Sequence, residues 1–362
     1  MNAAPSHSRP DAAWRRKFRE RLRTWYRRNA RSLPWKETRD PYRIWISEIM
    51  LQQTQVATVI DYYQRFLKRF PDVQSLAAAD EQEVLRLWEG LGYYRRAKQM
   101  RQAAIVLADQ YQGEFPQDVQ AIHALPGVGR YTAGAIASFA WDFPAPIVEA
   151  NTQRLYCRLL AYPEDPTRTA GQRLLWTFAE ELLPRKDAGE FNQALMDLGS
   201  AVCSPRSPDC ENCPIQGICP TEEAGLQATI PAPKKKMQYE EITEAAVVVR
   251  DGRKVLLRRC GEGERWAGLW DFPRFAVQGE PPQWLPKLAE MVRERTAVEI
   301  ELGESAASLK HGVTRFRITL HCYWGKPIRG SIQGDDLQWT AIEDLEAVPL
   351  SATGRKLCRM IF

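Results

Sequence analysis

The sequence feature that most constrains the fold is a set of four cysteines, at Cys203, Cys210, Cys213 and Cys219. They are spaced C-x6-C-x2-C-x5-C within a short Pro-rich segment. Four thiolates this close in sequence hold either a structural zinc ion or an iron–sulfur cluster. Zinc sites usually pair two tight C-x2-C hooks, and because only one pair is tight here, the spacing favours a 4Fe–4S cluster over zinc. Disulfides are disfavoured, because no signal peptide is evident and the chain reads as intracellular.

Length and composition limit the class of protein. With 362 residues the chain is too long for one compact core, so two domains are expected. No apolar stretch of about 18 residues occurs, so no transmembrane helix is predicted. The net charge of +5 is a mild indication of an anionic partner. We expect a cytoplasmic protein, associated with the nucleoid if it is bacterial.

The chain changes its hydrophobic period once. Residues 11–222 repeat apolar positions every three to four residues, which predicts helices. The first helix, over residues 14–31, is rich in arginine and has a basic face; a phosphate-facing surface, a solvated face and an Arg-rich transit peptide are all compatible with it. Residues 228–238, ATIPAPKKKMQ, are Pro- and Lys-rich and read as an extended linker.

After this linker the pattern alternates with period two. Residues 245–249 and 255–259 flank an Asp251-Gly252 turn, which predicts a β-hairpin. A helix at 285–295, a strand at 315–324 and a closing helix at 353–360 complete the prediction. The sequence therefore predicts an all-α domain over 11–227 that includes the cysteine loop, the linker, and an α+β domain over 239–362.

A glycine-rich turn lies between two predicted helices at Leu125-Pro-Gly-Val-Gly-Arg-Tyr-Thr-Ala-Gly134. Gly127 and Gly129 allow backbone amides to point outward at a helix N-terminus, an arrangement that binds phosphate without reading sequence. A plain helix–helix turn is the alternative for a lone G-x-G. The full motif is more specific and resembles the helix-hairpin-helix of DNA base-excision glycosylases. That superfamily places an acidic residue downstream, where Glu149 stands.

Two carboxylates lie in contrasting surroundings. Breaking the N-glycosidic bond of a base needs one protonated and one ionised carboxyl group, as in sugar hydrolysis. Glu48 lies among large apolar residues, where burial raises a pKa. Glu149 precedes a predicted helix, whose N-terminus favours the charged form. The alternative is that Glu48 is a solvated helix residue and Glu149 an ordinary first-turn acid.

The chain resembles the adenine DNA glycosylase (MutY) family. The similarity is dense over residues 14–222 and weaker afterwards, for example at Trp266–Pro273. The segments that carry it are Leu33–Trp35, Pro41-Tyr42, Trp45–Thr54 (WISEIMLQQT), Gly90–Tyr94, Leu125–Gly134, Phe191-Asn192, Met196–Gly199 and the four cysteines.

This resemblance implies a fold and an activity. The first domain would be a helix-hairpin-helix glycosylase domain with a 4Fe–4S loop that contacts DNA, in which Arg206 lies. The second would be a Nudix-like lesion-recognition domain. The protein would be a monomer that removes adenine mispaired with 8-oxoguanine or guanine in double-stranded DNA, without membrane association.

The resemblance also implies roles for single residues. Glu48 would protonate adenine N7, and Glu149, Tyr131 and Asn151 would complete the catalytic set. Tyr131 stands where bifunctional relatives carry a Schiff-base lysine, so little strand cleavage is expected. Arg31, Trp35, Leu51 and Gln193 would line the adenine pocket, and Gln53 and Tyr93 would wedge into the duplex. The full set implied to bind DNA or substrate is Arg31, Trp35, Leu51, Gln52, Gln53, Tyr93, Gly127, Gly129, Gln193, Thr314 and Arg315.

The chain departs from the family pattern at three places. The family has Asp-Gly-Asn where this chain has Glu149-Ala150-Asn151, which adds a methylene and removes a glycine. A mispair-binding protein with weak or no excision is therefore an alternative, and a glycosylase for another base is a third. The family's Phe-Ser-His lesion-reading loop is Val313-Thr314-Arg315 here, and these residues either read the lesion or merely begin a strand. Glu290–Ala297 lacks the Glu-rich Nudix box, so no nucleotide hydrolysis is expected.

Overall fold

The computed structural model describes residues 10–233 and 237–362. Part of the predicted linker, Lys234–Lys236, lies outside the described residues. The chain forms two compact units, which are described separately. The first contains the described residues 10–78 and 102–233, and the second contains Ala79–Arg101 together with residues 237–362. The boundary between the units therefore falls inside helix α6.

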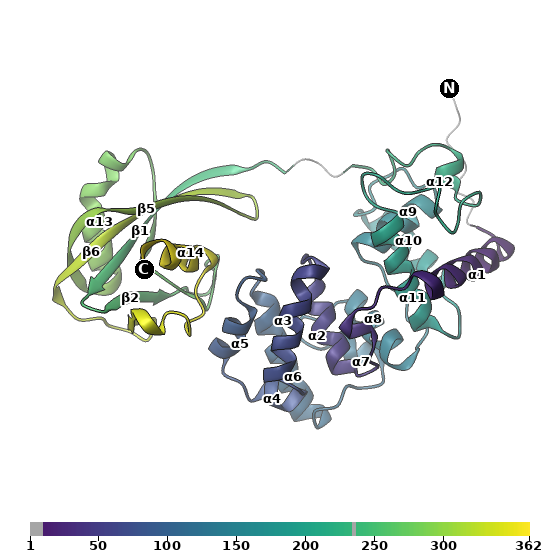
Figure 1. Ribbon diagram of the computed structural model, residues 1–362, viewed down its shortest axis with the longest axis horizontal. Helices are drawn as coiled ribbons and strands as arrows, with labels where there is room; N and C mark the ends of the chain where they lie inside the picture. The colour runs from purple at the N-terminus through teal and green to yellow at the C-terminus, as the bar shows by residue number, and fades with distance from the viewer. Residues whose placement is uncertain (1–9, 234–236) are drawn as a thin grey trace. The chain divides into compact units, whose positions relative to one another are not determined.

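The part of the chain before the linker is helical, as predicted (Figure 1). Its elements are α1 (Ala12–Asn29), a 3-10 turn (Pro34–Lys36), α2 (Pro41–Leu51), α3 (Val56–Arg69), α4 (Val73–Ala77), α5 (Glu81–Trp88), α6 (Arg95–Tyr111), α7 (Val119–His123), α8 (Arg130–Trp141), α9 (Ala150–Leu159), α10 (Thr169–Leu182), α11 (Ala188–Asp197), a π-helical turn (Leu198–Val202) and α12 (Pro220–Glu223).

Helix α2 is the central helix of the first unit. Asp40 caps it by accepting a hydrogen bond from the backbone of Tyr42, and Pro41 occupies the first turn, where its missing N–H costs nothing. The helix is buried on nearly every side, which is typical of a helix apolar all round. It packs against α3 and α8. A second core joins α1, α9, α10 and α11, with Phe18, Phe178 and Phe191 among its fully buried side chains.

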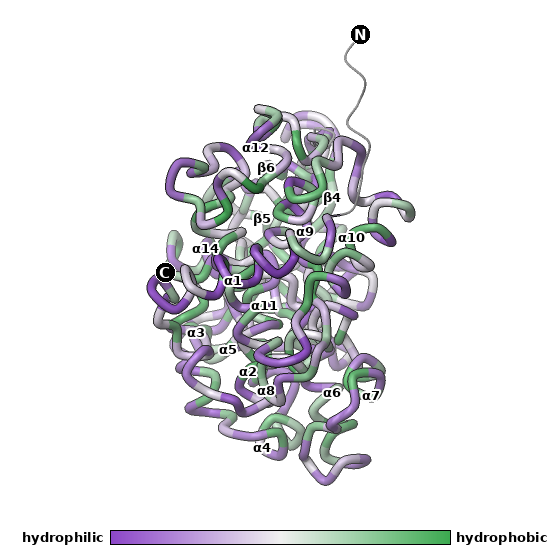
Figure 2. Tube along the Cα trace, turned by 90° about the vertical axis from the view of Figure 1, so that its right-hand side faces the viewer, coloured by the Kyte–Doolittle hydropathy of each residue, from purple (hydrophilic) through white to green (hydrophobic). Residues whose placement is uncertain are grey.

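Helix α1 confirms the predicted amphipathic helix. It buries Phe18, Leu22 and Tyr26, and Figure 2 draws it mostly in the purple of hydrophilic residues. Its basic face is only partly directed to solvent. Arg15 pairs with Glu181 at 3.0 Å, and Arg23 pairs with Asp187 at 2.6 Å. Much of the basic face therefore binds the protein's own helices.

The second unit is built on a seven-stranded mixed sheet (Figure 1). Its strands follow the order β3-β2-β1-β6-β5, with β4 paired to β1 and β7 paired to β2. Strand β1 is antiparallel to β2, as the predicted hairpin requires, and parallel to β6. The elements are β1 (Glu240–Asp251), β2 (Lys254–Arg259), β3 (Trp270-Asp271), β4 (Arg274–Val277), α13 (Pro281–Thr296), β5 (Val298–Val313), β6 (Phe316–Gly330), β7 (Leu337–Ala341), a 3-10 turn (Ile342–Asp344) and α14 (Ala352–Ile361).

Alternation along β1 explains how the sheet is covered on both faces. Ala245, Val247 and Val249 pack in one core with Trp284, Leu288 and Val292 of α13. The intervening Ala246 and Val248 pack in the other core with Leu357 and Cys358 of α14. Successive strand residues point to opposite faces, so a continuous apolar run serves both cores. The α+β prediction is confirmed.

Candidate active site

One cavity of about 630 Å³ in the first unit collects most of the predicted site residues. Its size is within the range of small-molecule sites. The predicted residues that line it are Arg31, Trp35, Glu48, Leu51, Gln52, Gln53, Gly127, Gly129, Tyr131, Glu149, Asn151 and Gln193. They come from α2, α8, α9, α11 and the segments between these helices, so the fold brings together residues far apart in sequence.

Glu48 lines this cavity and is buried. Its residue is only 4% exposed, so the alternative of a solvated helix residue is wrong. The Tyr131 hydroxyl donates a 2.6 Å hydrogen bond to Glu48 Oε2. Burial raises the pKa of Glu48 to about 7, opposed by the Tyr131 hydrogen bond and supported by the charge of Glu149. At neutral pH this carboxyl group therefore exists in both its protonated and its ionised forms.

Glu149 is the N-cap of α9. Its Oε1 accepts a 2.8 Å hydrogen bond from the Thr152 backbone, and the Thr152 hydroxyl accepts one from the Glu149 backbone, which completes a capping box. Ala150 is the first residue of α9 and has an ordinary helical backbone, so alanine is accommodated where the family has glycine.

The expected direction of the Glu149 pKa is wrong. Burial raises the pKa of Glu149, and hydrogen bonds from Asn151 and Thr152 together with the charge of Arg154 offset this only in part. The helix N-terminus does favour the carboxylate, but the loss of hydration is the larger effect. The pKa values of Glu48 and Glu149 are therefore both raised.

A chain of hydrogen bonds runs from Glu149 to the cysteine loop. The Asn151 side chain donates to Glu149 Oε2 at 3.3 Å and accepts from Arg154 Nη2 at 3.0 Å. Arg154 also donates from Nε to the carbonyl of Cys203 at 2.9 Å and from Nη2 to that of Gly199 at 2.6 Å. The side chain of Arg154 therefore ties the N-terminus of α9 to the cysteine loop.

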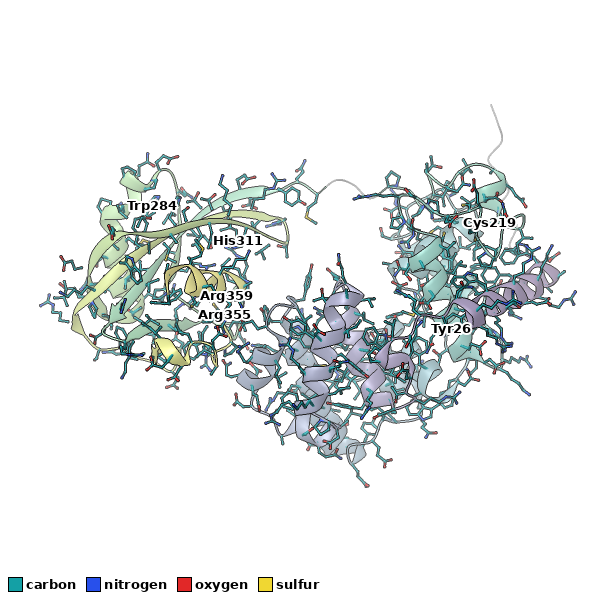
Figure 3. The ribbon with its side chains drawn as sticks, viewed as in Figure 1. Tyr26, Cys219, Trp284, His311, Arg355 and Arg359 are labelled. Atoms are coloured by element: carbon teal, nitrogen blue, oxygen red, sulfur yellow. The ribbon has the colours of Figure 1, made fainter. Side chains whose placement is uncertain are left out.

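Lys36 and Asp197, which line the cavity, and Tyr26, which contacts a residue that lines it, make contacts that the sequence did not indicate. The buried carboxylate of Asp197 accepts from Arg31 Nη2 and from Lys36 Nζ, each at 2.6 Å. Tyr26, labelled on α1 in Figure 3, donates to Gln193 Oε1 at 2.7 Å. Arg31 and Gln193 are thus held by partners from other segments. Asp197 lies in the Met196–Gly199 segment that carries the family resemblance, and this was the one sign in the sequence that it belongs to the site.

The glycine-rich turn has the geometry of a helix N-terminus open to a partner. Gly127 has a φ of +74°, which favours glycine, and Gly129 is the N-cap of α8. Apart from its own neighbours in the chain, no residue that the structure describes has an atom within 4 Å of the position that a Cβ on Gly129 would take. The fold itself therefore leaves space beside this glycine. Gly134 is different, because a Cβ there would lie 2.5 Å from the Pro146 carbonyl oxygen, so its lack of a side chain lets the segment before Glu149 approach α8.

Three predicted residues belong to the second unit and not to this cavity. Tyr93 is 52% exposed and has a φ of +49°. Thr314 and Arg315 form the two-residue turn between β5 and β6, since Val313 pairs with Phe316. They are exposed and do not begin a strand. The Thr314 hydroxyl donates to its neighbour Val313, and Arg315 lies 3.6 Å from Glu240.

The four cysteines line one small cavity between α9 and the loop that ends at α12, where Figure 3 labels Cys219. Arg158 of α9 donates from Nη1 to Cys203 Sγ at 3.2 Å. Within residues 10–233 and 237–362, no three His, Cys, Asp or Glu side chains converge closely enough to hold a single metal ion. Four thiols around one cavity are the ligand set of an iron–sulfur cluster. Arg206, in the same loop, is exposed.

Three regions match known protein families. Residues 46–181 match the HhH-GPD superfamily of base excision DNA repair proteins. Residues 203–219 match the iron–sulfur binding domain of endonuclease III, and residues 245–360 match the NUDIX domain. The four cysteines hold a 4Fe–4S cluster, and the fold is a helix-hairpin-helix glycosylase domain followed by a Nudix-like α+β domain.

Relatives along the chain are more specific. The adenine DNA glycosylase of Homo sapiens is 39% identical over 404 residues, covering 95% of this chain and 73% of the human protein. That of Mus musculus is 38% identical over 289 residues and covers 77% of this chain. The chain spans 55% of the mouse protein's length, about half, as it does of the rat protein's.

A solved structure is similar over the first part of the chain. A thermostable thymine-DNA glycosylase superimposes with a TM-score of 0.55 and 32% identity, covering 59% of this chain and 100% of that one. Because the human protein matches over most of both chains, this chain belongs to the adenine DNA glycosylase family.

Proposed function

We propose that this protein is a monofunctional DNA glycosylase that removes adenine mispaired with 8-oxoguanine or guanine from double-stranded DNA. The observation that carries the proposal is a buried Glu48, bonded to Tyr131, in a cavity that Glu149 also lines. The cavity has the volume for a base that has left the helical stack. Its walls combine apolar residues such as Trp35 and Leu51 with the polar Gln193 and Arg31.

The reaction follows from the two carboxyl groups. Glu48 in its protonated form donates its proton to adenine N7, which makes the base a better leaving group. The N-glycosidic bond then breaks and leaves positive charge on the sugar, which the Glu149 carboxylate stabilises. Water adds to the sugar carbon, and the proton released from that water returns to Glu48. Asn151 and Thr152 hold the Glu149 carboxylate in place for this step.

We expect base removal without strand cleavage, because neither Tyr131 nor Lys36 is suited to form a Schiff base with the sugar. Tyr131 cannot form a Schiff base. Lys36 also lines the cavity, and burial lowers its pKa, but its amine donates to Asp197 at 2.6 Å and is held as an ammonium partner. Borohydride should therefore trap no covalent complex with abasic DNA through this cavity.

The remaining contacts belong to DNA binding. The amides near Gly127 and Gly129 hold the backbone phosphate, and the space beside Gly129 admits it. Gln53 and Tyr93 wedge into the duplex, and the cluster organises a loop that presents Arg206. Thr314 and Arg315, at the exposed tip of the β5–β6 hairpin, read the base opposite adenine.

The domain division and setting complete the proposal. The glycosylase domain spans 11–227, the linker 228–238 and the Nudix-like domain 239–362. The protein acts as a monomer in the cytoplasm, on the nucleoid if it is bacterial. In the described parts of the chain no helix has the length and apolar character needed to cross a membrane.

A single-turnover excision assay tests the proposal. Duplexes would carry each purine or damaged base on either strand, and cleavage of the resulting abasic sites would be measured. We expect excision of adenine opposite 8-oxoguanine and guanine only. Glu149→Gln keeps the hydrogen bond to Thr152 and removes the charge, so it should slow excision on the order of 100- to 1000-fold.

Three results would contradict this reading. Tight binding to the mispair without excision by the parent chain would make the protein a mispair-binding member of the family. Equal rates for the parent and Glu149→Gln would remove Glu149 as the stabilising carboxylate. Excision of another base would change the substrate.

A further inference from the structure

Glu89 ends α5 and stands directly before the Gly90–Tyr94 loop. This loop has an unusual backbone, with φ values of +100° at Gly90, +69° at Gly92 and +49° at Tyr93. Such values cost little at glycine and more at tyrosine, and they persist only where neighbouring contacts hold the backbone. The loop therefore depends on its anchors.

The loop is braced from within. Trp88 Nε1 donates to the Gly92 carbonyl at 3.1 Å, and Arg96 Nη2 donates to the Leu91 and Gly92 carbonyls, each at 3.1 Å. The Arg96 guanidinium also lies 5.6 Å from the centre of the Tyr93 ring. These contacts fix the shape of the loop and leave Tyr93 half exposed at its end.

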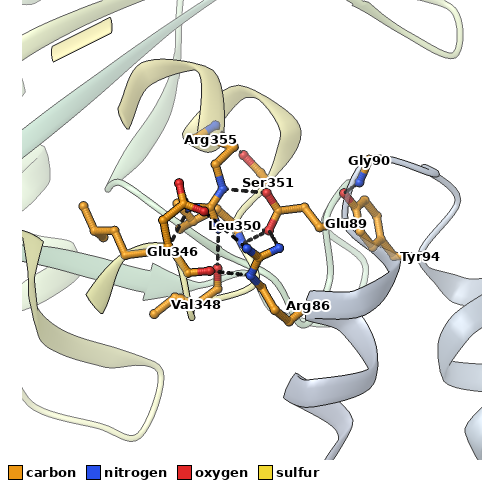
Figure 4. Close-up of polar contacts among 11 residues, drawn as sticks. Arg86, Glu89, Gly90, Tyr94, Glu346, Val348, Leu350, Ser351 and Arg355 are labelled. Atoms are coloured by element: carbon orange, nitrogen blue, oxygen red, sulfur yellow. Dashed lines mark hydrogen bonds and ion pairs between the residues drawn. The ribbon is translucent and has the colours of Figure 1, made fainter. Parts of the chain in front are cut away.

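The anchor of the loop is an ion pair with α14 (Figure 4). Arg355 donates from Nε to Glu89 Oε1 at 2.6 Å and from Nη2 to Glu89 Oε2 at 3.0 Å. Both side chains are under 10% exposed, at 7% for Arg355 and 9% for Glu89. Arg355 further donates to the carbonyls of Leu345 and Val348, so each of its three guanidinium nitrogens donates a hydrogen bond.

Other contacts hold the same short segment to the sheet domain. The Leu350 backbone donates to Glu89 Oε2 at 3.3 Å. At the start of α5, Gln82 donates to the Gly268 carbonyl at 3.0 Å and accepts from Trp270 Nε1 at 2.9 Å. Helix α5 is thus held at both ends within the second unit, and the end nearer the loop uses a buried, bidentate charge pair.

From these contacts we infer that Arg355 is a positioning residue for excision: it acts through Glu89 to fix the loop that presents Tyr93. This deepens the proposed function, on which it rests, because it assigns part of the duplex-wedging geometry to α14. The Nudix-like domain then contributes to excision through a contact that is separate from the Thr314–Arg315 tip. Arg355 itself touches no base.

The test is a double-mutant cycle in the full chain. Arg355→Met keeps the length and apolar stem of the side chain and removes the bidentate pair. It should slow single-turnover excision of adenine about 10- to 100-fold, since displacements near 1 Å at a reacting site have effects of this order. In a Tyr93→Ala background the same change should have no further effect. Arg355→Lys, which keeps the charge without the fork, should restore part of the rate.

Controls separate positioning from folding. Arg329→Met removes an exposed ion pair with Glu299 in the same domain and should leave excision unchanged. Melting temperatures would be measured for every variant. If Arg355→Met lowers the melting temperature, Glu89→Gln replaces it, because glutamine keeps an acceptor of the same length.

A second readout separates this inference from the proposed function. 2-Aminopurine beside the mispair reports wedging by its fluorescence without any excision. If the parent chain fails to excise adenine, the proposed function fails, yet Arg355→Met should still reduce the fluorescence change. The inference is overturned if Arg355→Met matches the parent in the fluorescence change, or slows excision equally with and without Tyr93.

Discussion

Glu48 can hold a proton near neutral pH because the residues that enclose it raise its pKa. The side chain is on a helix that is buried nearly all round, so its carboxylate loses most of its hydration. Tyr131 returns one hydrogen bond to the carboxylate, which is too little to offset that loss. A pKa of about 7 gives an acid that can donate a proton near neutral pH.

Glu48→Gln separates the acid function from stability. We expect this variant to lose excision while its free energy of unfolding rises relative to the parent at high pH. The folded pKa of Glu48 lies above its unfolded value, so its contribution to stability is complete below the unfolded pKa and is lost as pH rises towards about 7. The difference should approach about 3 kcal/mol at pH 8 and vanish near pH 4.

Urea unfolding of both proteins at these two pH values measures that difference. For the parent, the excision rate should fall as pH rises through about 7, because the acid is then ionised. A stability difference that does not change with pH would show that Glu48 is not the buried acid described here.

Sequence reasoning identified half of the residues that line the cavity but not the direction of their pKa shifts. The motifs named Glu48, Tyr131 and Gln193, and the cavity contains all three. The motifs did not reveal that burial raises the pKa of Glu149 more than the helix N-terminus lowers it. Burial depends on which distant segments of the chain pack against a residue. The pairing of Lys36 with Asp197 was missed for the same reason, since the two residues are far apart in the chain.

Among the helices, α1 shows how a charged face can be structural. Arginines four residues apart face α10 and α11, as Arg15 with Glu181 and Arg27 with Glu190 illustrate. Arg19 donates to the backbone carbonyls of Glu181, Leu182 and Leu183 at the C-terminal end of α10. The last carbonyls of a helix point away from it as hydrogen-bond acceptors, and a cation there also suits the helix dipole.

Arg19→Met should therefore destabilise the protein, and Arg16→Met should not. Arg19→Met removes three hydrogen bonds from the guanidinium to carbonyls at the end of α10, with an expected effect of about 1–3 kcal/mol. Arg16 is exposed on the same helix and should change the free energy of unfolding by less than about 0.5 kcal/mol. Chemical denaturation of the three proteins measures both changes. Equal stability of the two variants would mean that the α10 terminus does not need Arg19.

At the scale of the whole molecule, the switch from helical to alternating periodicity predicted the class of each part. The Asp251-Gly252 hairpin and the helices of the second part are confirmed. The sequence did not indicate that Ala79–Arg101 belongs to the same compact unit as the sheet. That association depends on side-chain pairs such as Glu89 with Arg355, which no periodicity reports.

The two roles proposed for the second unit are separable. Replacing both Thr314 and Arg315 by alanine should reduce the preference for adenine opposite 8-oxoguanine over adenine opposite guanine, because the tip would lose its polar contacts. The rate on the guanine mispair should stay near that of the parent. Arg355→Met should instead slow both reactions and keep their ratio. Single-turnover rates on the two duplexes measure this, and an unchanged ratio in the tip variant would remove the hairpin tip from lesion recognition.

Helix α9 carries Glu149 at one end, and its Arg154 and Arg158 bind Cys203 through the carbonyl and the sulfur. The cysteine loop and the proposed catalytic carboxylate are therefore both attached to α9. In a chain made without iron, the cysteine loop would lack its cluster and Arg154 would lose a fixed partner in Cys203, so Asn151 would be held less firmly, while Thr152 would still hold Glu149. Iron supply would then affect how many copies are active, although the proposed bond-breaking step uses only Glu48 and Glu149.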